Sequence, residues 1–226
     1  QGVHQQVGVK GNKGIDYENK TIDWEITINA DKQDLRNFIL TDNFSGSGQQ
    51  LVDGSIEVDP SISNNQITTN DDGEGFVIDF GDITETYTIT YQTQFTYDFE
   101  GEKTPHFNNT VDITYETNDG TDYELEIEDE VDPEDNTRNN GVKNGKADND
   151  TKEITWTVDV NYNNLTLTDA KVIDEIADNQ SLIEGSVKVY ETSIDSGGNI
   201  TTGDDVTEDF DVTAGESLVE VLFSGE

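Results

Sequence analysis

The chain contains no cysteine and no methionine among its 226 residues. Without cysteine it has neither a disulfide framework nor a thiolate metal site, so as a secreted protein it would need another source of stability. No segment approaches the roughly 20 consecutive apolar residues that a membrane-spanning helix requires. Its first residues lack the regions of a signal peptide, and its last residues lack a sorting signal. We therefore expect an internal piece of a longer protein.

Basic residues are also scarce, because only 12 lysines and arginines accompany 50 aspartates and glutamates. The resulting formal net charge of -38 opposes binding to nucleic acid or to an anionic membrane, since both require clustered positive charge. Such a charge is typical of a solvated, self-repelling surface that keeps a long protein soluble and extended. Hydrophobic residues make up only 31% of the chain, so disorder is the first alternative to exclude.

The sequence repeats itself with a period of roughly 130 residues. Trp24 precedes Asp42 by 18 residues, and Trp156 precedes Asp174 by the same distance. Both tryptophans lie in the pattern Ile-x-Trp-x-[Ile/Val]-x-[Ile/Val]-Asn. The matched blocks are 9–29 with 142–161, 51–58 with 182–189, and 75–80 with 216–221. Matched blocks in one order indicate a duplicated domain.

The repeat unit has the period-two alternation of half-buried strands, which argues against disorder. Apolar residues alternate with polar ones throughout residues 22–28, 87–95, 111–115, 123–127 and 154–160. Clusters of Asn, Asp, Gly and Ser separate these runs, and no useful helical period is present. Short strands with regular turns predict an all-β fold. We expect tandem antiparallel β-sandwiches with Trp24 and Trp156 in equivalent core positions.

An acidic run that contains a proline divides the two copies. We expect a complete first domain at residues 1–130, an acidic linker at 131–139 and a second domain at 140–226. Nothing in the second copy corresponds to residues 83–115 of the first. We therefore expect the second domain to be C-terminally incomplete, so that either further residues or another chain complete it.

The order of these blocks, followed by Phe107-Asn108-Asn109-Thr110-Val111, resembles the collagen-adhesin (Cna-type) domain family of Gram-positive surface proteins. The resemblance covers essentially all of the first domain and about two thirds of the second. It implies immunoglobulin-like sandwiches at the surface of a Gram-positive-type cell wall. Many members of that family carry a spontaneous isopeptide bond, which joins a lysine on the first strand to an asparagine on the last. An aspartate on a middle strand promotes this bond.

Carried onto this chain, the resemblance assigns the cross-link to Lys10 and Asn109 and the promoting role to Asp42. Lys10 is preferred over Lys13 because both copies share its Val-Lys opening. Asn109 is preferred over Asn108 because alternation from Val111 turns Asn109 inward. The alternative is that a lysine before a strand is merely solvated and that the aspartate starts a turn.

In the second copy Lys143 and Asp174 match the lysine and the aspartate, but no asparagine acceptor is present. The chemistry has a physical basis, because burial lowers the pKa of a lysine and raises that of an aspartate. A neutral amine can then attack the amide, and a neutral carboxyl can hydrogen-bond it and polarise its carbonyl. Fixed geometry supplies the effective concentration.

No arrangement typical of a turnover enzyme is found, so we expect no enzymatic activity beyond a single intramolecular bond. We expect no metal or other cofactor, with calcium at the acidic turn 70–74 as the alternative, although this turn lacks the order of an EF-hand loop. Three functions fit the sequence. The first is an extracellular stalk module of a cell-wall-anchored adhesin, with adjacent repeats as partners. The second is a binding module for a host matrix protein such as collagen, and the third is an ion-dependent acidic surface protein.

Overall fold

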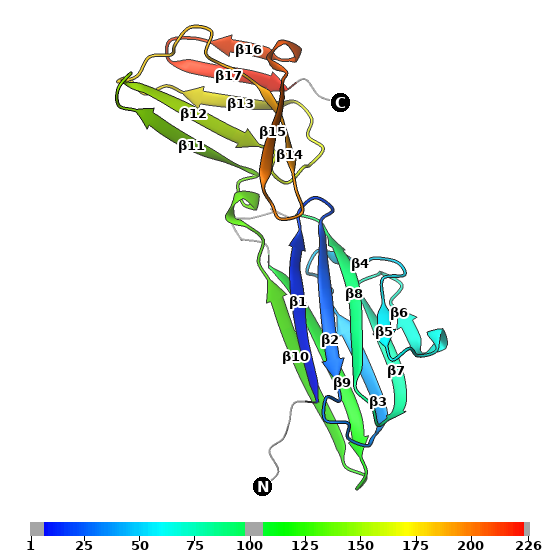
Figure 1. Cartoon of the computed structure of the whole chain (residues 1–226). Coiled ribbons are helices and arrows are strands. Elements are labelled where there is room, and N and C mark those ends of the chain that lie inside the picture. Colours follow the sequence, from blue (N-terminus) through cyan, green and yellow to red (C-terminus); the bar gives the residue numbers. More distant parts are fainter. Residues whose placement is uncertain (1–6, 98–105, 224–226) are drawn as a thin grey trace. The chain divides into compact units, whose positions relative to one another are not determined.

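The computed structural model describes residues 7–97 and 106–223 (Figure 1). The chain divides into two compact units, residues 1–139 (unit 1) and 140–226 (unit 2). The described residues form β-strands and no α-helix, and each strand pairing is antiparallel. Within residues 7–97 and 106–223, three single-turn 3₁₀ helices connect strands, η1 (Asn64–Gln66), η2 (Asp135–Thr137) and η3 (Thr207–Asp209). The all-β prediction is confirmed.

The described part of unit 1 is a sandwich of two five-stranded sheets. The first sheet has the order β1 (Gly8–Asp16), β2 (Thr21–Ile28), β8 (Tyr87–Phe95) and β4 (Gln49–Leu51), with β5 (Glu57–Asp59) also on β8. The second sheet has the order β10 (Asp122–Val131), β9 (Phe107–Thr117), β3 (Leu35–Asn43), β7 (Gly75–Ile83) and β6 (Ile67–Thr69). The first strand therefore lies in one sheet, and the strand that carries Asn109 lies in the other.

The core of unit 1 forms where the inward faces of the two sheets meet. Alternation turns every second side chain of β2 and β8 inward, so Trp24, Ile26, Ile89 and Tyr91 are at most 2% exposed. Phe38, Leu40, Phe76, Ile78, Phe107 and Ile113 face them from the second sheet. Burial of each such side chain contributes about 1.5–3 kcal/mol. The apolar minority of this acidic chain is thus concentrated in one layer.

A buried polar path also crosses the core of unit 1. The indole Nε1 of Trp24 donates to Thr93 Oγ1 at 2.9 Å, and Thr93 Oγ1 donates to Gln49 Oε1 at 2.7 Å. Gln49 Nε2 donates in turn to the carbonyl oxygen of Asn108 at 3.0 Å. Because each of these buried polar groups has a partner, the hydrogen bonds offset the cost of burying them and fix the indole and the start of β9.

Up to residue 223, unit 2 forms three small sheets. They are β11 (Gly141–Asp148) with β12 (Glu153–Val160), β13 (Ala170–Glu175) with β17 (Leu218–Phe223) and β16 (Asp211–Ala214), and β14 (Tyr190–Ile194) with β15 (Ile200–Asp205). The register repeats that of unit 1, because Trp24 lies opposite Asn12 and Trp156 lies opposite Gly145. The hairpin β11–β12 is therefore the counterpart of β1–β2.

The structure shifts the alignment of residues 75–80 with residues 216–221 by two positions. Asp42 on β3 pairs with Phe76 on β7, whereas Asp174 on β13 pairs with Val219 on β17. Phe76 is thus equivalent to Val219, although the sequence match aligned it with Ser217. A shift by two keeps every side chain on its own face of the sheet, so the alternation alone did not reveal it.

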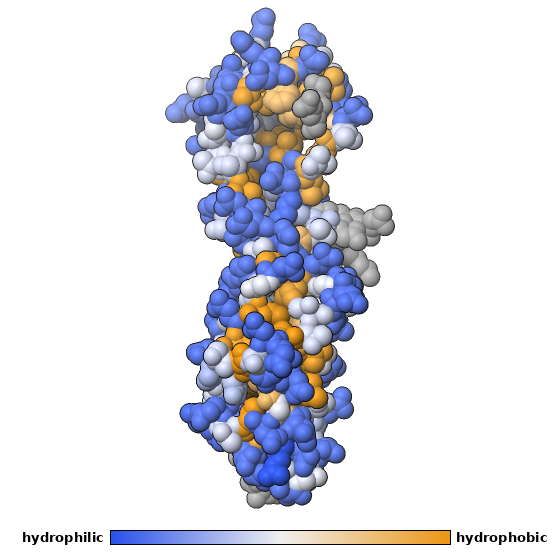
Figure 2. Space-filling view, turned by 90° about the vertical axis from the view of Figure 1, so that its right-hand side faces the viewer, coloured by the Kyte–Doolittle hydropathy of each residue, from blue (hydrophilic) through white to orange (hydrophobic). Residues whose placement is uncertain are grey.

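The prediction of equivalent core positions for the two tryptophans is wrong. Trp24 is 1% exposed, whereas Trp156 is 47% exposed. In unit 1, β8 pairs with β2 and brings Tyr91 and Thr93 over the indole of Trp24. Within residues 140–223, no strand pairs with the corresponding edge of β12. The face of that hairpin that carries Trp156 therefore keeps contact with solvent, as do Ile154, Val158 and Val160. Figure 2 shows apolar residues at the molecular surface of the chain as orange patches.

The stretch between the units is ordered on unit 1. The backbone N–H of Glu134 donates to the hydroxyl of Tyr17 at 2.8 Å, and η2 follows directly. Thr137 is fully buried, and its hydroxyl donates to the carbonyl oxygen of Glu134 at 2.6 Å. The backbone of this stretch is thus tied to unit 1 through Tyr17, while the acidic side chains of Asp132, Glu134 and Asp135 are exposed.

Candidate functional site

A lysine, an aspartate and an asparagine occupy neighbouring inward positions in the core of unit 1. Lys10 on β1, Asp42 on β3 and Asn109 on β9 are respectively 8%, 0% and 1% exposed. Period two explains each placement, because Asp42 shares the inward face with Leu40 and Asn109 shares it with Val111. Gly75 on β7 lies opposite Asn43 on β3, and a Cβ at Gly75 would collide with the backbone carbonyl oxygen of Asp42. Its lack of a side chain lets β7 approach β3 at the aspartate.

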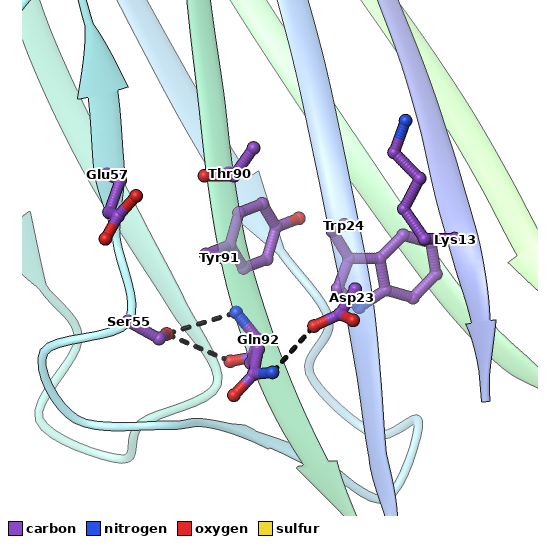
Figure 3. A pocket seen from close by; sticks show the side chains of 8 residues that line it. All are labelled: Lys13, Asp23, Trp24, Ser55, Glu57, Thr90, Tyr91 and Gln92. Carbon is purple, nitrogen blue, oxygen red and sulfur yellow. Dashed lines mark hydrogen bonds between the residues drawn. The ribbon is translucent and has the colours of Figure 1, made fainter. Parts of the chain in front are cut away.

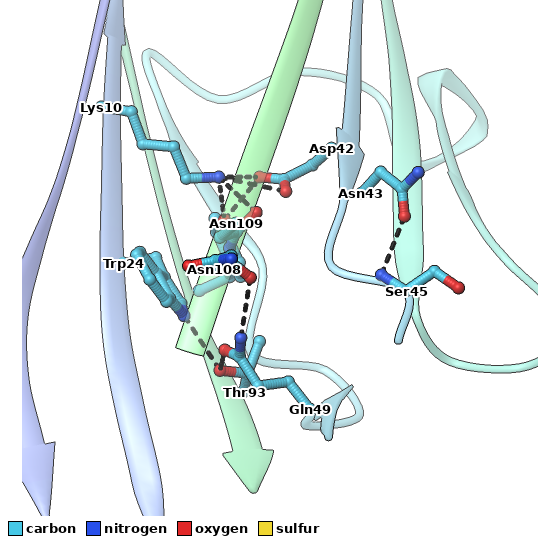
Figure 4. A network of polar contacts seen from close by, with 10 residues as sticks. Lys10, Trp24, Asp42, Asn43, Ser45, Gln49, Thr93, Asn108 and Asn109 are labelled. Carbon is cyan, nitrogen blue, oxygen red and sulfur yellow. Dashed lines mark hydrogen bonds and ion pairs between the residues drawn. The ribbon is translucent and has the colours of Figure 1, made fainter. Parts of the chain in front are cut away.

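The three side chains meet at the amine of Lys10 (Figure 4). Lys10 Nζ donates to both carboxylate oxygens of Asp42, at 3.1 and 3.0 Å. It also lies 2.5 Å from Asn109 Oδ1, which is bonded directly to the amide carbon. The amine comes from the first sheet, while the carboxylate and the amide come from the second. A covalent bond between Lys10 and Asn109 would therefore tie the two sheets together.

Tyr91 is a fourth member of this cluster that sequence reasoning missed. Its hydroxyl donates to Asp42 Oδ2 at 2.5 Å and accepts from Lys10 Nζ at 3.0 Å and from Asn109 Nδ2 at 2.7 Å. In the sequence Tyr91 is one more apolar position in an alternating strand. Its position opposite Trp24 in the β2–β8 pairing places it in the cluster, and the sequence gives no signal for that pairing.

Burial disfavours charge on both members of the Lys10–Asp42 pair. Desolvation lowers the pKa of Lys10 from 10.5 to about 8, although the negative charge of Asp42 opposes this shift. Desolvation likewise raises the pKa of the Asp42 carboxyl against the opposing effect of Lys10. Both shifts favour transfer of a proton from the amine to the carboxylate. The environment thus promotes a neutral amine next to a neutral acid, the pair that amide attack requires.

Aromatic rings exclude water from the cluster. Lys10 Nζ lies 5.3 Å from the ring centroid of Trp24 and 5.7 Å from that of Tyr91. Phe76 packs edge-on against Tyr91 at 4.9 Å, and Phe44 stacks on it at 6.4 Å. The side chains of both Lys10 and Asp42 are fully inaccessible to solvent. A dry site of this kind strengthens electrostatic interactions inside it.

The two alternative cross-link residues lie away from the cluster. Lys13 is exposed, and its Nζ pairs with Glu25 Oε1 at 3.2 Å on the surface. Asn108 is exposed on β9, with its side chain on the face opposite to that of Asn109. Asn109 lies on β9, and β10 follows it in unit 1, so this asparagine stands on the penultimate strand rather than the last.

Unit 2 repeats part of the cluster. Lys143 Nζ lies 2.7 Å from Asp174 Oδ1 and 4.8 Å from the ring centroid of Trp156. Both side chains of the pair are partly accessible, at 42% for Lys143 and 26% for Asp174. Neither a tyrosine nor an asparagine contacts this pair among the described residues. The amine of unit 2 therefore has a carboxylate partner but, among the described residues, no neighbouring asparagine.

A hollow of about 420 Å³ lies on the solvent side of the first sheet of unit 1 (Figure 3). Outward-facing residues of β2 and β8, among them Asp23 and Gln92, form its floor, and Gln92 Nε2 donates to Asp23 Oδ1 at 2.7 Å. Its other charged lining residues are Lys13 and Glu57. The hollow is open and mixed in charge.

Neither a metal cluster nor a membrane-spanning helix is found in residues 7–97 and 106–223. No group of three or more His, Cys, Asp or Glu side chains there has the arrangement of a metal site. No helix there is long and apolar enough to cross a bilayer. At the acidic turn 70–74, Glu74 accepts a hydrogen bond from the hydroxyl of Ser45, and Asp72 caps the N–H of Glu74.

The fold and its buried cluster define a class, that of immunoglobulin-like β-sandwich domains. The model of one family, the collagen binding domain, matches residues 10–124 and again residues 138–218. The chain belongs to this family, and the resemblance inferred from its sequence is confirmed. It is a family of binding domains and not of enzymes. The two matches also reproduce the duplication.

Several solved structures are similar to this chain. The collagen-binding subdomain of the Enterococcus faecalis surface protein ACE has 20% identity and a TM-score of 0.44, over 58% of this chain and 100% of that chain. The collagen-binding domain of a Staphylococcus aureus adhesin has 16% identity and a TM-score of 0.45 over the same shares. The major pilin subunit of Bacillus cereus has 10% identity and a TM-score of 0.41, over 96% of this chain and 66% of that chain. A comparison with curated proteins finds no significant match.

Proposed function

We propose that this chain is a structural repeat module of a Gram-positive surface adhesin, and that an autocatalytic bond between Lys10 and Asn109 locks its first unit. The observation that carries the proposal is the buried contact of Lys10 Nζ with both Asp42 and the Asn109 amide. The similar solved structures include a surface protein, an adhesin and a pilin, which agrees with a place at the cell surface.

The reaction balances without any cofactor. Lys10 gives a proton to Asp42 and attacks Cγ of Asn109 as a neutral amine. A bond forms between Lys10 Nζ and Asn109 Cγ, the bond from Cγ to Nδ2 breaks, and ammonia leaves. The proton that Lys10 gave up remains on Asp42, which becomes a carboxylate again when the released ammonia takes that proton and departs as ammonium. Because the folded chain holds the reactants together, the effective concentration of the amine is high.

The bond suits a load-bearing extracellular module. It joins residues that are 99 positions apart and connects the first sheet to the second. It thereby provides the long-range covalent constraint that a chain without cysteine cannot obtain from disulfides. The net charge of -38 and the duplication fit a soluble, extended stalk in which repeats are neighbours.

Intact-mass measurement tests the proposal. The purified protein should be lighter than its sequence mass by one ammonia, and the Asp42→Ala variant should have its full sequence mass. A loss of one ammonia in both proteins, or in neither, would contradict the assigned role of Asp42. The Asp174→Ala variant is the matched control, because Lys143 lacks an acceptor in the described residues and the loss should be unchanged.

The second candidate is direct binding of a host matrix protein such as collagen. The family match carries it, since the family is the collagen binding domain. The open hollow on the first sheet is a surface on which to test it. Immobilised collagen should retain the intact protein, and retention should fall when Gln92 and Asp23 are both replaced by alanine. An absence of retention at physiological salt would leave the structural module as the function.

A further inference from the structure

The hydroxyl of Tyr91 occupies a special place in the buried cluster. A phenol has one donor hydrogen and two acceptor lone pairs. Tyr91 uses all three, by donating to Asp42 Oδ2 and accepting from Lys10 Nζ and Asn109 Nδ2. It is the group in the described cluster that contacts the carboxyl, the amine and the amide nitrogen together.

The chemistry requires a proton to reach the amide nitrogen. An amide is a poor leaving group as an anion, so Nδ2 of Asn109 has to be protonated before it departs as ammonia. The carboxyl of Asp42 is the natural source, because it takes the proton that Lys10 gives up. The oxygens of Asp42 contact Lys10 and Tyr91, but in the described residues they make no hydrogen bond to Asn109. Direct polarisation of the amide by Asp42, as expected from the sequence, is therefore absent from this geometry.

We propose, on the basis of the bond formation described above, that Tyr91 is a catalytic residue that relays a proton from Asp42 to the leaving nitrogen of Asn109. Once Asp42 holds the proton from Lys10 and the amide nitrogen has become an acceptor, both hydrogen bonds of the phenol run in the direction opposite to that in the structure. In this step the Asp42 carboxyl gives its proton to the Tyr91 oxygen as the phenol gives its own to Nδ2. The phenol is unchanged at the end, and Asp42 becomes a carboxylate that accepts the next proton from the amine bound to Cγ. Counted from the neutral amine and the protonated Asp42, the sum is one new amide and one ammonia, and Asp42 ends protonated as it began this stage. The proton that Lys10 first gave up stays on Asp42 until the released ammonia carries it away as ammonium.

The surroundings of Tyr91 suit this role. Its ring is held by Phe44 and Phe76 and is 2% exposed, so bulk water does not compete for its hydroxyl. The two distances on the path are 2.5 Å to Asp42 Oδ2 and 2.7 Å to Asn109 Nδ2, which are within proton-transfer range. Burial and the charge of Asp42 hold the pKa of the phenol well above its ordinary value. The hydroxyl therefore keeps its proton at neutral pH and is available to donate it.

A time course of bond formation tests the relay. The full chain is synthesised in a pulsed cell-free translation, samples are denatured in acid at intervals, and the fraction that has lost ammonia is read by intact mass. Tyr91→Phe removes only the hydroxyl and leaves the ring packing in place. We expect it to form the bond at least tenfold more slowly than the wild type. Tyr87→Phe, on the same strand and away from the cluster, should react at the wild-type rate.

The outcomes separate this inference from the proposed function. If the wild type never loses ammonia, the proposed function fails. If the wild type reacts and Tyr91→Phe reacts within twofold of its rate, the relay alone is overturned. If Tyr87→Phe is slowed as much as Tyr91→Phe, the effect is a general loss of core stability and the relay is again overturned.

A second variant covers the case in which Tyr91→Phe does not fold, as judged by circular dichroism. Site-specific replacement of Tyr91 by 3-fluorotyrosine keeps the shape of the side chain and makes its hydroxyl more acidic. A relay that donates to the leaving nitrogen should then run more than twofold faster than in the wild type. An unchanged rate would overturn the relay.

Discussion

Replacement of Lys10 by methionine isolates the contribution of the proposed cross-link to stability. Methionine has a similar length and is flexible, so it can fill the space beside Trp24 and Tyr91. It removes the nucleophile without leaving a buried cation. Asp42 keeps its hydrogen bond from Tyr91, and burial raises its pKa, so it can remain in the core as a neutral acid. The largest loss should therefore be that of the covalent constraint.

The size of this loss follows from the span of the bond. Lys10 and Asn109 are 99 positions apart, and the chain-entropy treatment gives about 4–5 kcal/mol for a closed loop of that length. Unit 1 has 139 residues, so its unfolding entropy makes 1 kcal/mol equivalent to roughly 3–4 °C. Lys10→Met should therefore lower the melting temperature of unit 1 by about 15 °C.

Differential scanning calorimetry, with intact mass measured on the same samples, provides the assay. Lys143→Met is the matched control, because Lys143 forms a partly exposed pair with Asp174 and should contribute well below about 1 kcal/mol. If the wild type has lost one ammonia but melts within about 3 °C of Lys10→Met, the entropic account of the bond is refuted. If Lys143→Met destabilises the chain equally, the effect does not come from the cross-link.

Three further predictions concern pH, packing and charge. The rate of bond formation should be greatest near neutral pH and fall above about pH 8, because Lys10 and Asp42 then lose the proton they share. The titratable groups that face Lys10 are Asp42 on β3, Tyr91 on β8 and Asp129 on β10. A rate that still rises at pH 10 would contradict this prediction. Trp24→Phe should destabilise unit 1 by about 2–3 kcal/mol in urea unfolding, because Thr93 loses its donor, whereas Trp156→Phe should change stability by under about 1 kcal/mol. Equal effects would show that burial does not decide the cost. The chain should pass through heparin and DNA resins unretained at physiological salt, and retention would indicate a basic surface that its composition does not provide.

The strands of unit 1 could be predicted from sequence because each has one buried face. Alternation in residues 22–28 and 87–95 follows directly from the pleat, and β2 and β8 lie within one residue of these limits. The same alternation turned Asn109 inward and Asn108 outward, as the structure has them. A pattern of period two thus carries information about the face on which each side chain lies.

The remaining features depend on partners that alternation does not specify. Trp156 has the same local pattern as Trp24, but its exposure depends on whether another strand covers β12. Tyr91 joins the cluster because β8 pairs with β2 in one register and not another. The two-residue error between Phe76 and Val219 has the same origin, since a slip of two preserves the faces. Long-range pairing is therefore the information that the sequence pattern lacked.

The most direct test of the account is tandem mass spectrometry of the digested wild-type protein. We predict one branched peptide in which Lys10 is joined to Asn109 with the loss of one ammonia, and a free Lys143 in this chain. Recovery of unmodified Lys10 and Asn109 peptides in full yield would contradict the cross-link. A branched peptide at Lys13 or Asn108 would contradict the assignment that the buried cluster supports.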